Sequence, residues 1–296
     1  MASGRMNLPN FTWGTRTYVM GILNLTPDSF SGDGLMQAKK PMPDLTGLLA
    51  MEQARRFVNA GVSILDVGGE STRPGSEPVN VEDEVARVLP VIRLVAEAFP
   101  EMPISVDTYK ASVAEAALQA GAMMVNDVWG LRADPEMGAV VARYGVPVVL
   151  MHNRSKPANA EVEARLGGRY VGVHYDDLLE DVKRELLESV ALAHAAGVAD
   201  EQIILDPGIG FGKTVAQNLE LLNRLDEIKA IGYPVLLGPS RKSFIGYTLD
   251  LPPEQRVEGT AATIAIGIAR GADIVRVHDV VAMVRVAKMT DAIVRR

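Results

Sequence analysis

The stretch "QIILDPGIGFGKTVAQNLELLNRLDEIKAIG" (residues 202–232) contains one complete strand–loop–helix unit. It begins with a short apolar run typical of a buried strand, and it ends with the apolar spacing of an amphipathic helix. Gly232 closes the unit with the residue that most often terminates a helix. A single unit cannot bury its apolar surfaces, so the fold depends on whether the rest of the chain repeats it.

The glycine-rich loop of this unit fits neither common nucleotide-binding pattern. A P-loop requires a glycine five residues before Gly212, where the chain has Pro207. A dinucleotide-binding fingerprint requires a glycine at the position of Lys213. The loop is therefore either a flexible turn after a buried strand or a place where the backbone approaches a ligand closely.

Apolar runs of strand length recur eight times along the chain, most of them separated by segments with helical spacing. The expected strands cover residues 17–25, 63–69, 103–108, 122–128, 147–152, 202–208, 234–240 and 273–279. The expected helices cover residues 48–61, 82–99, 110–121, 135–145, 175–197, 215–232, 253–271 and 280–296. This alternation predicts a (β/α)8 TIM barrel, with a doubly wound sheet as the alternative.

The composition is that of a globular protein without a nucleic-acid or membrane partner. Of 296 residues 48% are hydrophobic, and no linker or low-complexity segment divides them, so we expect a single domain over residues 1–296 with residues 1–16 as an N-terminal extension. The absence of cysteine excludes a disulfide framework, a thiolate metal site and a cysteine nucleophile. No apolar run is long enough to cross a bilayer, and we expect a cytoplasmic location. Because the net charge is −7, an anionic substrate would need a local cluster of cations.

Polar side chains gather at the carboxyl ends of the expected strands, where TIM-barrel active sites lie. These residues are Asn24, Asp66, Glu70, Asp107, Asn126, Asp127, His152, Asp206, Arg241, Lys242, Arg276 and His278. Arg241, Lys242, Arg276 and His278 follow the last two strands, where barrels often hold phosphate, and form the expected cationic cluster. Any one Asp or Asn could instead cap the following helix.

Three of the loops on this rim are longer than the usual connection. They follow the first, second and fifth strands, at residues 26–46, 70–80 and 153–171. Loops of this length are functional or unstructured, which makes these three candidate lids over the barrel mouth.

Motifs along nearly the whole chain resemble those of the dihydropteroate synthase family. They are "MGILNLTPDSFS", "LDVGGESTRPGS", "SVDTYK", "VNDV", "LDPGIGFGKT", "GPSRKSFIG" and "IVRVHDV", in that order. The resemblance implies an enzyme that joins a dihydropterin pyrophosphate to p-aminobenzoate, with loss of pyrophosphate before the aryl amine attacks.

The same resemblance implies which residues bind the substrates. The pterin would contact Asp107, Asn126, Met151, Asp206 and Lys242. The pyrophosphate would lie against Asn24, Thr72, Arg73, Arg276 and His278, with Asn24 also a ligand of Mg²⁺. The p-aminobenzoate would contact Phe30, Thr72, Pro74, Lys242 and Ser243. The catalytic set would be Asp33, Thr72, Arg73, Lys242, Arg276 and His278.

The chain departs from the family pattern at two places. In "SFSGDG" the acid Asp33 is displaced by one position from the family's pattern. After the fifth strand "MHNRSKP" replaces the family's glycine-rich turn, and Met151 is either a pocket residue or an ordinary core methionine. We expect His152 and His174 to be structural or surface residues, because neither has a second histidine or acid at metal-ligand spacing.

Other functions fit parts of the pattern. Pterin-binding barrels include methyltransferases that act on reduced folates, but those have no pyrophosphate to bind. A silent paralogue would be expected to lack Asp206 or Lys242, and an aldolase would use Lys242 as a Schiff base. The helix around "GTAATIAIGIA" (residues 259–269) is apolar on every side, and this pattern predicts a homodimer, with one crowded helix in a monomer as the alternative.

Overall fold

Eight parallel strands form the centre of the protein. The computed structural model describes residues 11–26, 43–71, 76 and 78–295. The strands are β1 (Tyr18–Asn24), β2 (Ile64–Gly68), β3 (Ile104–Asp107), β4 (Met124–Asp127), β5 (Val148–Met151), β8 (Ile203–Asp206), β9 (Leu236–Leu237) and β10 (Ile274–Val277). They are hydrogen-bonded in the order β8-β5-β4-β3-β2-β1-β10-β9. A parallel bridge between Leu205 and Val235 brings the two ends of this sheet together, so the sheet is a barrel rather than doubly wound.

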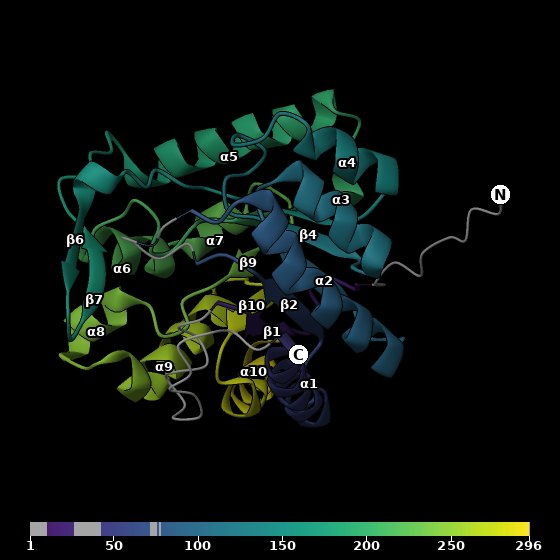
Figure 1. The fold of residues 1–296 in the computed structure, drawn as a ribbon. Helices are drawn as coiled ribbons and strands as arrows, with labels where there is room; N and C mark the ends of the chain where they lie inside the picture. The colour runs from purple at the N-terminus through teal and green to yellow at the C-terminus, as the bar shows by residue number, and fades with distance from the viewer. Residues whose placement is uncertain (1–10, 27–42, 72–75, 77, 296) are drawn as a thin grey trace.

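Helices surround the barrel and connect successive strands (Figure 1). They are α1 (Pro43–Ala60), α2 (Val81–Ala98), α3 (Ala111–Ala120), α4 (Met137–Tyr144), α5 (Leu178–Ala195), α6 (Val215–Asn223), α7 (Leu225–Lys229), α8 (Ser243–Leu249), α9 (Val257–Ala269) and α10 (Val280–Val294). The helix expected over residues 215–232 is divided into α6 and α7, because Arg224 leaves the helical conformation at φ −111° and ψ 26°. No helix among the described residues is long and apolar enough to cross a membrane.

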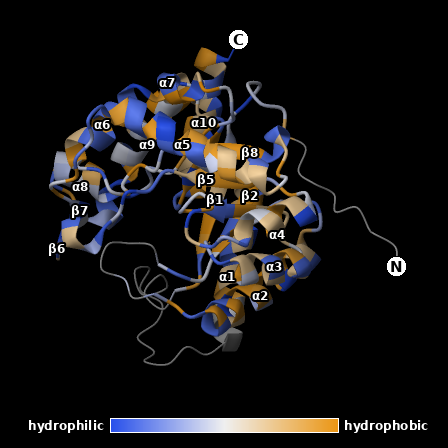
Figure 2. Cartoon of the chain, turned by 90° about the horizontal axis from the view of Figure 1, so that it is seen from above, coloured by the Kyte–Doolittle hydropathy of each residue, from blue (hydrophilic) through white to orange (hydrophobic). Residues whose placement is uncertain are grey.

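Apolar side chains fill the amino-terminal end of the barrel. One buried cluster inside the barrel consists of Tyr18, Met20, Ile64, Met124, Val149, Ile204, Leu236 and Ile274. Phe11 and Trp13 pack against it, so part of the segment expected as an N-terminal extension covers the floor of the barrel. In Figure 2 the central strands are coloured mostly hydrophobic, while the surrounding helices carry both hydrophobic and hydrophilic residues. The opposite, carboxyl-terminal end of the barrel carries the polar groups.

The long segment after β5 is built into the structure. It contains a 3-10 helix (Pro157–Asn159) and an antiparallel hairpin of β6 (Ala160–Glu163) and β7 (Gly167–Tyr170). The hydroxyl of Tyr247 in α8 donates to the carbonyl of Gly167 at 3.2 Å. This hairpin therefore lies beside α8 at the edge of the barrel (Figure 1). Most of the expected first lid and the centre of the second, residues 27–42 and 72–75, lie outside the described residues.

Candidate active site

The parallel strands bring the predicted site residues to one rim. Asn24, Asp107, Met151 and Asp206 are the last residues of β1, β3, β5 and β8. Carboxyl ends of parallel strands lie at the same end of a barrel, so these side chains share its mouth. Phe30, Asp33, Thr72, Arg73 and Pro74 lie outside the described residues.

Arg276 reaches across the barrel mouth and binds an aspartate on each of two strands, β2 and β3. Its Nε donates to Oδ2 of Asp66 at 2.6 Å, and its Nη2 donates to Oδ2 of Asp107 at 2.6 Å. The Nδ2 of Asn126 also donates to Oδ2 of Asp66, at 3.2 Å. The carboxylate of Asp66 thus holds Arg276 and Asn126 together, and Arg276 in turn binds Asp107.

Asp66 belongs to this cluster although the family resemblance gave it no role. It is fully buried, and its Oδ1 has no hydrogen-bond partner among the described residues. Its place at the polar end of an apolar strand was visible in "SILDVGG". The sequence did not show that Asp66 pairs with Arg276, because the two residues are 210 positions apart in the chain.

Burial opposes ionisation of two acids at the barrel mouth, Asp107 and Asp206. The pKa of Asp107 is raised to about 7, mainly by burial, with Arg276 acting in the opposite direction and Asp66 adding to the rise. The pKa of Asp206 is also raised by burial, against the attraction of Lys242. The barrel mouth is therefore a place where carboxylates depend on cations to stay charged.

Asp206 is oriented by the turn that follows it. Its carboxylate is buried, and Oδ1 accepts a hydrogen bond from the backbone N–H of Gly208 at 2.7 Å. Gly208 has a φ of +71°, and a Cβ added there would lie 1.8 Å from the carbonyl oxygen of His152. Glycine at this position is thus required by both the turn and a close backbone contact.

Lys242 reaches over the same turn from the start of α8. Its ammonium group donates to the carbonyl of Ile209 and lies 4.5 Å from the centre of the Phe211 ring. A Cβ added at Gly210 would lie 2.8 Å from Cδ of Lys242. Burial lowers the pKa of Lys242 to about 8, although Asp206 favours the charged form. Phe211 is a contact of the predicted site that the sequence reasoning missed.

The other predicted rim residues have definite places. His278 lies against Ser240, whose Oγ is 3.1 Å from both its backbone nitrogen and its Nδ1. Ser243 is the first residue of α8 and is half-buried, and Met151 is buried beside Asp206 in register. His174 is exposed.

Arg241 differs from its expected role in the cationic cluster. Its Nε and Nη2 donate to the two carboxylate oxygens of Asp279 at 2.9 and 2.5 Å. The backbone of Arg241 is in the left-handed region at φ +56°, and Asp279 lies just after the end of β10. The guanidinium is therefore committed to an ion pair beside the site.

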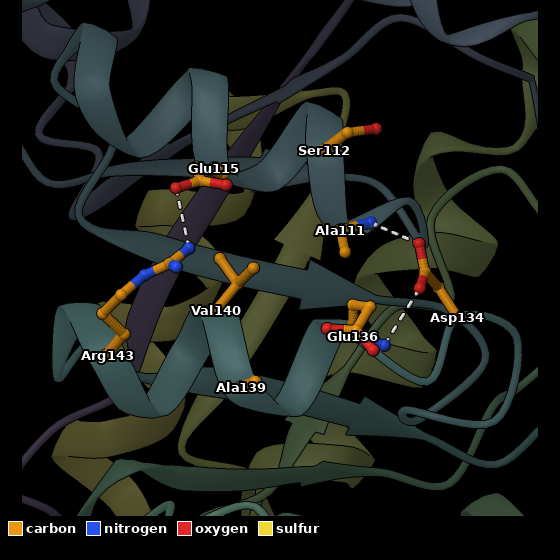
Figure 3. Close-up of a pocket in the computed structure, with 8 residues that line it drawn as sticks. All are labelled: Ala111, Ser112, Glu115, Asp134, Glu136, Ala139, Val140 and Arg143. Carbon is orange, nitrogen blue, oxygen red and sulfur yellow. Dashed lines mark hydrogen bonds and ion pairs between the residues drawn. The ribbon is translucent and has the colours of Figure 1, made fainter.

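A hollow of about 320 Å³ between α3 and α4 is not part of this rim (Figure 3). Two of the carboxylates that line it already accept hydrogen bonds from other groups of the protein. Asp134 accepts from the backbone N–H of Ala111 at 2.8 Å, and Glu115 accepts from Arg143 at 2.7 Å. The barrel mouth remains the candidate active site.

Comparison with known proteins identifies the family. A family model described as "Pterin binding enzyme" matches residues 20–278. Dihydropteroate synthase of Clostridium beijerinckii is 52% identical, with 97% of each chain covered, and that of Bacillus subtilis is 49% identical over 95% of this chain and 90% of its own. The chain belongs to the dihydropteroate synthase family.

Solved structures of this family have the same fold. A Clostridium difficile dihydropteroate synthase in the presence of pteroic acid has a TM-score of 0.85 at 47% identity, covering 97% of this chain and 100% of its own. A Yersinia pestis dihydropteroate synthase in complex with a sulfonamide drug has a TM-score of 0.84 at 39% identity, covering 95% of this chain and 96% of its own. The resemblance to the family and the expected TIM barrel are confirmed, and the chain is a transferase of folate biosynthesis.

Proposed function

We propose that the barrel mouth joins 6-hydroxymethyl-7,8-dihydropterin pyrophosphate to p-aminobenzoate, giving 7,8-dihydropteroate and pyrophosphate. The observation that carries the proposal is that Asp206 and Lys242 converge on one glycine turn, beside a cluster of Asp107 and Arg276. A pterin ring offers adjacent N–H donors on one edge and acceptors on another, and these need a buried carboxylate and a buried cation respectively.

Asp206 is the proposed partner of the pterin donors. Its Oδ1 is already oriented by Gly208, and no described residue donates to its Oδ2. Lys242 would donate to the acceptor side, with Asp107 and Asn126 contacting the remaining ring nitrogens and Met151 lining the pocket. Asp206 is buried, and hydrogen bonds are stronger in a buried environment than in water.

Arg276 is the proposed anchor of the pyrophosphate. Its guanidinium is held by Asp66 and Asp107 at the rim, where an entering phosphate oxygen can compete for the N–H groups. His278, Asn24, Thr72 and Arg73 complete this proposed set. Because these hydrogen-bond donors and cations strengthen their hold as charge develops on the leaving group, they lower the barrier to its departure.

Magnesium is the proposed cofactor, bound through Asn24. The described residues contain no cluster of three or more acidic, histidine or cysteine side chains that could hold a metal alone. The half-buried amide of Asn24 at the end of β1 fits an ion that keeps waters and takes most of its ligands from phosphate oxygens. When bound, magnesium would neutralise charge on the departing pyrophosphate.

The proposed reaction is dissociative. The bond between the pterin methylene carbon and the pyrophosphate oxygen breaks first, and its electron pair leaves with the oxygen. The aryl amine nitrogen then attacks the resulting carbocation and loses one proton. No covalent bond to the protein is needed, and the task of the site is to position the two substrates and exclude water.

The p-aminobenzoate is proposed to contact Phe30, Thr72, Pro74, Lys242 and Ser243, and Asp33 is proposed to assist catalysis from the first loop. We further propose a cytoplasmic enzyme with one catalytic domain over residues 1–296, in which residues 1–16 extend the barrel.

A homodimer is also proposed, packed through α9. Ile266 on this helix is 49% exposed, and Met289 and Ile293 on the neighbouring α10 are 63% and 59% exposed. Sedimentation at micromolar concentration should give twice the chain mass. A monomer would refute the dimer without affecting the proposed reaction.

A rate assay tests the proposed reaction. With both substrates present, pyrophosphate release should require Mg²⁺, and a sulfonamide should raise the KM for p-aminobenzoate without changing kcat. Absence of dihydropteroate when both substrates and Mg²⁺ are present, or inhibition that excess p-aminobenzoate does not relieve, would contradict the proposal.

A further inference from the structure

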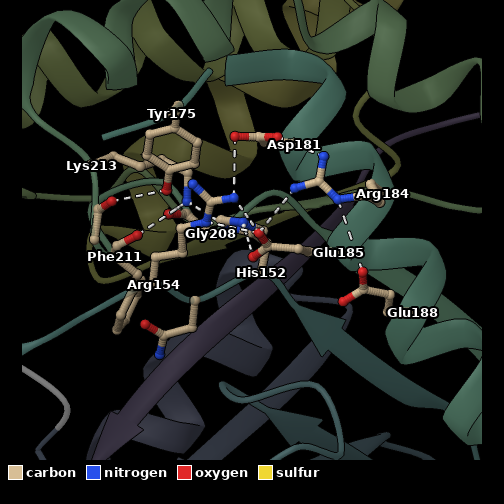
Figure 4. A network of polar contacts seen from close by, with 12 residues as sticks. His152, Arg154, Tyr175, Asp181, Arg184, Glu185, Glu188, Gly208, Phe211 and Lys213 are labelled. Atoms are coloured by element: carbon tan, nitrogen blue, oxygen red, sulfur yellow. Dashed lines mark hydrogen bonds and ion pairs between the residues drawn. The ribbon is translucent and has the colours of Figure 1, made fainter. Parts of the chain in front are cut away.

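Lys213 is a buried cation that the proposed reaction does not use. It is 1% exposed, and its Nζ has three partners: Nδ1 of His152 at 2.9 Å, the carbonyl of Gly208 at 3.0 Å and the carbonyl of Phe211 at 3.1 Å (Figure 4). All three donors of an ammonium group are thereby used. Burial lowers its pKa well below 10.5, since none of these partners is a carboxylate. Such a costly group needs a compensating role.

Two of the three partners belong to the turn at residues 207–212. The same turn presses against the backbone after β5, where a Cβ added at Gly212 would lie 2.3 Å from the carbonyl carbon of Arg154. The Oη of Tyr175 donates to the carbonyl of Gly212 at 2.9 Å. The turn is therefore fixed at both ends against its neighbours.

A second layer of side chains supports His152. Because Nδ1 accepts from Lys213, the ring proton lies on Nε2, which is 3.0 Å from Oε2 of Glu185, although off the direction of an ideal hydrogen bond. Arg154 donates from Nε to Oε1 of Glu185 at 2.8 Å. Figure 4 shows these groups converging from α5, the β5 end and the glycine turn. Glu185 thus connects α5 to Lys213 through His152.

The 207–212 turn holds two of the proposed pterin contacts in place. The N–H of Gly208 orients Asp206, and the carbonyl of Ile209 accepts from Lys242. Displacing the turn would move the carboxylate and the ammonium together. Lys213 itself is enclosed by protein and contacts neither group directly among its hydrogen bonds.

We propose that Lys213, supported by His152 and Glu185, is a positioning residue that fixes the 207–212 turn and so holds Asp206 and Lys242 in place for binding the pterin. This inference rests on the proposed function. In this role the lysine of "GFGKT" raises the affinity for the substrate without binding phosphate and without taking part in the reaction.

The decisive variant is Lys213→Met, which keeps an unbranched apolar stem and removes the three donors. Its dissociation constant for the dihydropterin pyrophosphate should rise by about 10- to 100-fold, the effect of a small displacement of binding groups. Backbone amides of residues 208–212 should exchange faster with solvent.

The matched control is Lys229→Met at the other end of the barrel. It removes an ammonium group 2.6 Å from the buried carboxylate of Asp273 and should lower stability while leaving the pterin dissociation constant unchanged. If Lys213→Met does not fold, Glu185→Gln weakens the same support, and its pterin dissociation constant should rise several-fold.

The outcomes separate this inference from the proposed function. Wild-type protein that does not bind the dihydropterin pyrophosphate would refute the proposed function itself. Wild-type binding with an unchanged dissociation constant in Lys213→Met, or in Glu185→Gln if that variant is used, would overturn the positioning role alone. Equal losses of pterin affinity in Lys213→Met and Lys229→Met would show that Lys213 contributes only to general stability. That result would also overturn the positioning role.

Discussion

Arg276 donates from Nη2 to Oδ2 of Asp107 across 2.6 Å, which joins the proposed pyrophosphate anchor to a proposed pterin contact. Asp66 holds the same guanidinium through its Nε. Binding of the substrate must therefore redistribute hydrogen bonds that already exist in the protein. The arginine is pre-oriented at the rim, which reduces the entropy lost when a phosphate binds.

Replacing Arg276 by alanine should reduce both catalysis and stability. Pyrophosphate release at saturating Mg²⁺ should fall by at least about 100-fold, the usual cost of removing one donor to developing charge. The unfolding free energy should fall by about 3 to 5 kcal/mol, because Asp66 and Asp107 keep their burial and lose their cation. A rate assay and urea denaturation measure the two effects separately.

Arg276→Lys is the control for charge. It keeps a cation for one carboxylate and cannot bridge both, so its stability and rate should lie between those of the wild type and Arg276→Ala. Undiminished pyrophosphate release in Arg276→Ala would show that the proposed anchor lies elsewhere.

Lys242 should give substrate binding an alkaline limit. Burial lowers its pKa to about 8, so the donor to the pterin is lost as pH rises through this value. The dissociation constant for the dihydropterin pyrophosphate should therefore increase between pH 7.5 and pH 9.5, measured against the titration of the free pterin. In Lys242→Arg the guanidinium stays charged and this increase should disappear. The same alkaline limit in that variant would contradict the assignment.

The same lysine should also affect the pH dependence of stability. Its pKa is lower in the folded protein, about 8, than the ordinary value of 10.5. The folded state therefore binds fewer protons between these values, and stability falls as pH drops from 10.5 to 8, with no further loss below. Lys242→Met should reduce that slope, as measured by urea denaturation across this range, and the remainder should come from Lys213, whose pKa burial also lowers. An unchanged slope would mean that Lys242 is not the buried base.

Gly208 offers a test of the close turn beside Asp206. Gly208→Ala would place a Cβ 1.8 Å from the carbonyl oxygen of His152, at a φ of +71°. Gly145→Ala is matched to it, with a φ of +65° and no atom within 4 Å of the added Cβ. Backbone strain alone should cost Gly145→Ala about 1 kcal/mol, and overlap should cost Gly208→Ala about 1 to 3 kcal/mol more. Equal unfolding free energies would argue against a close approach of Gly208 to the backbone of His152.

The barrel was predictable because strand and helix signals alternate with little ambiguity. The expected strand over residues 273–279 contains β10, Ile274–Val277, at its centre. The expected strand over residues 234–240 is reduced to Leu236–Leu237, since Gly238 and Pro239 end it. The short helix α8 was not predicted, because seven residues carry too little periodicity to be recognised.

From the strand pattern, only the rim on which the site residues lie was predictable, because the direction of the parallel strands determines it. Parallel strands place Asp107, Asp206 and Arg276 at one rim whatever their side chains do. Pairing of Arg276 with Asp66 depends on how side chains cross the barrel between residues 210 positions apart, and no local pattern encodes that. The commitment of Arg241 to Asp279 was hidden for the same reason.

The central claim is that Asp206 holds the pterin edge through a carboxylate. Calorimetric titration with the dihydropterin pyrophosphate, with and without Mg²⁺, tests it by comparing the wild type with Asp206→Asn. The amide puts a donor where an acceptor is needed, so affinity should fall by about 1.5 to 3 kcal/mol in both conditions. An Asp206→Asn titration that matches the wild type would contradict the assignment of this site to a pterin.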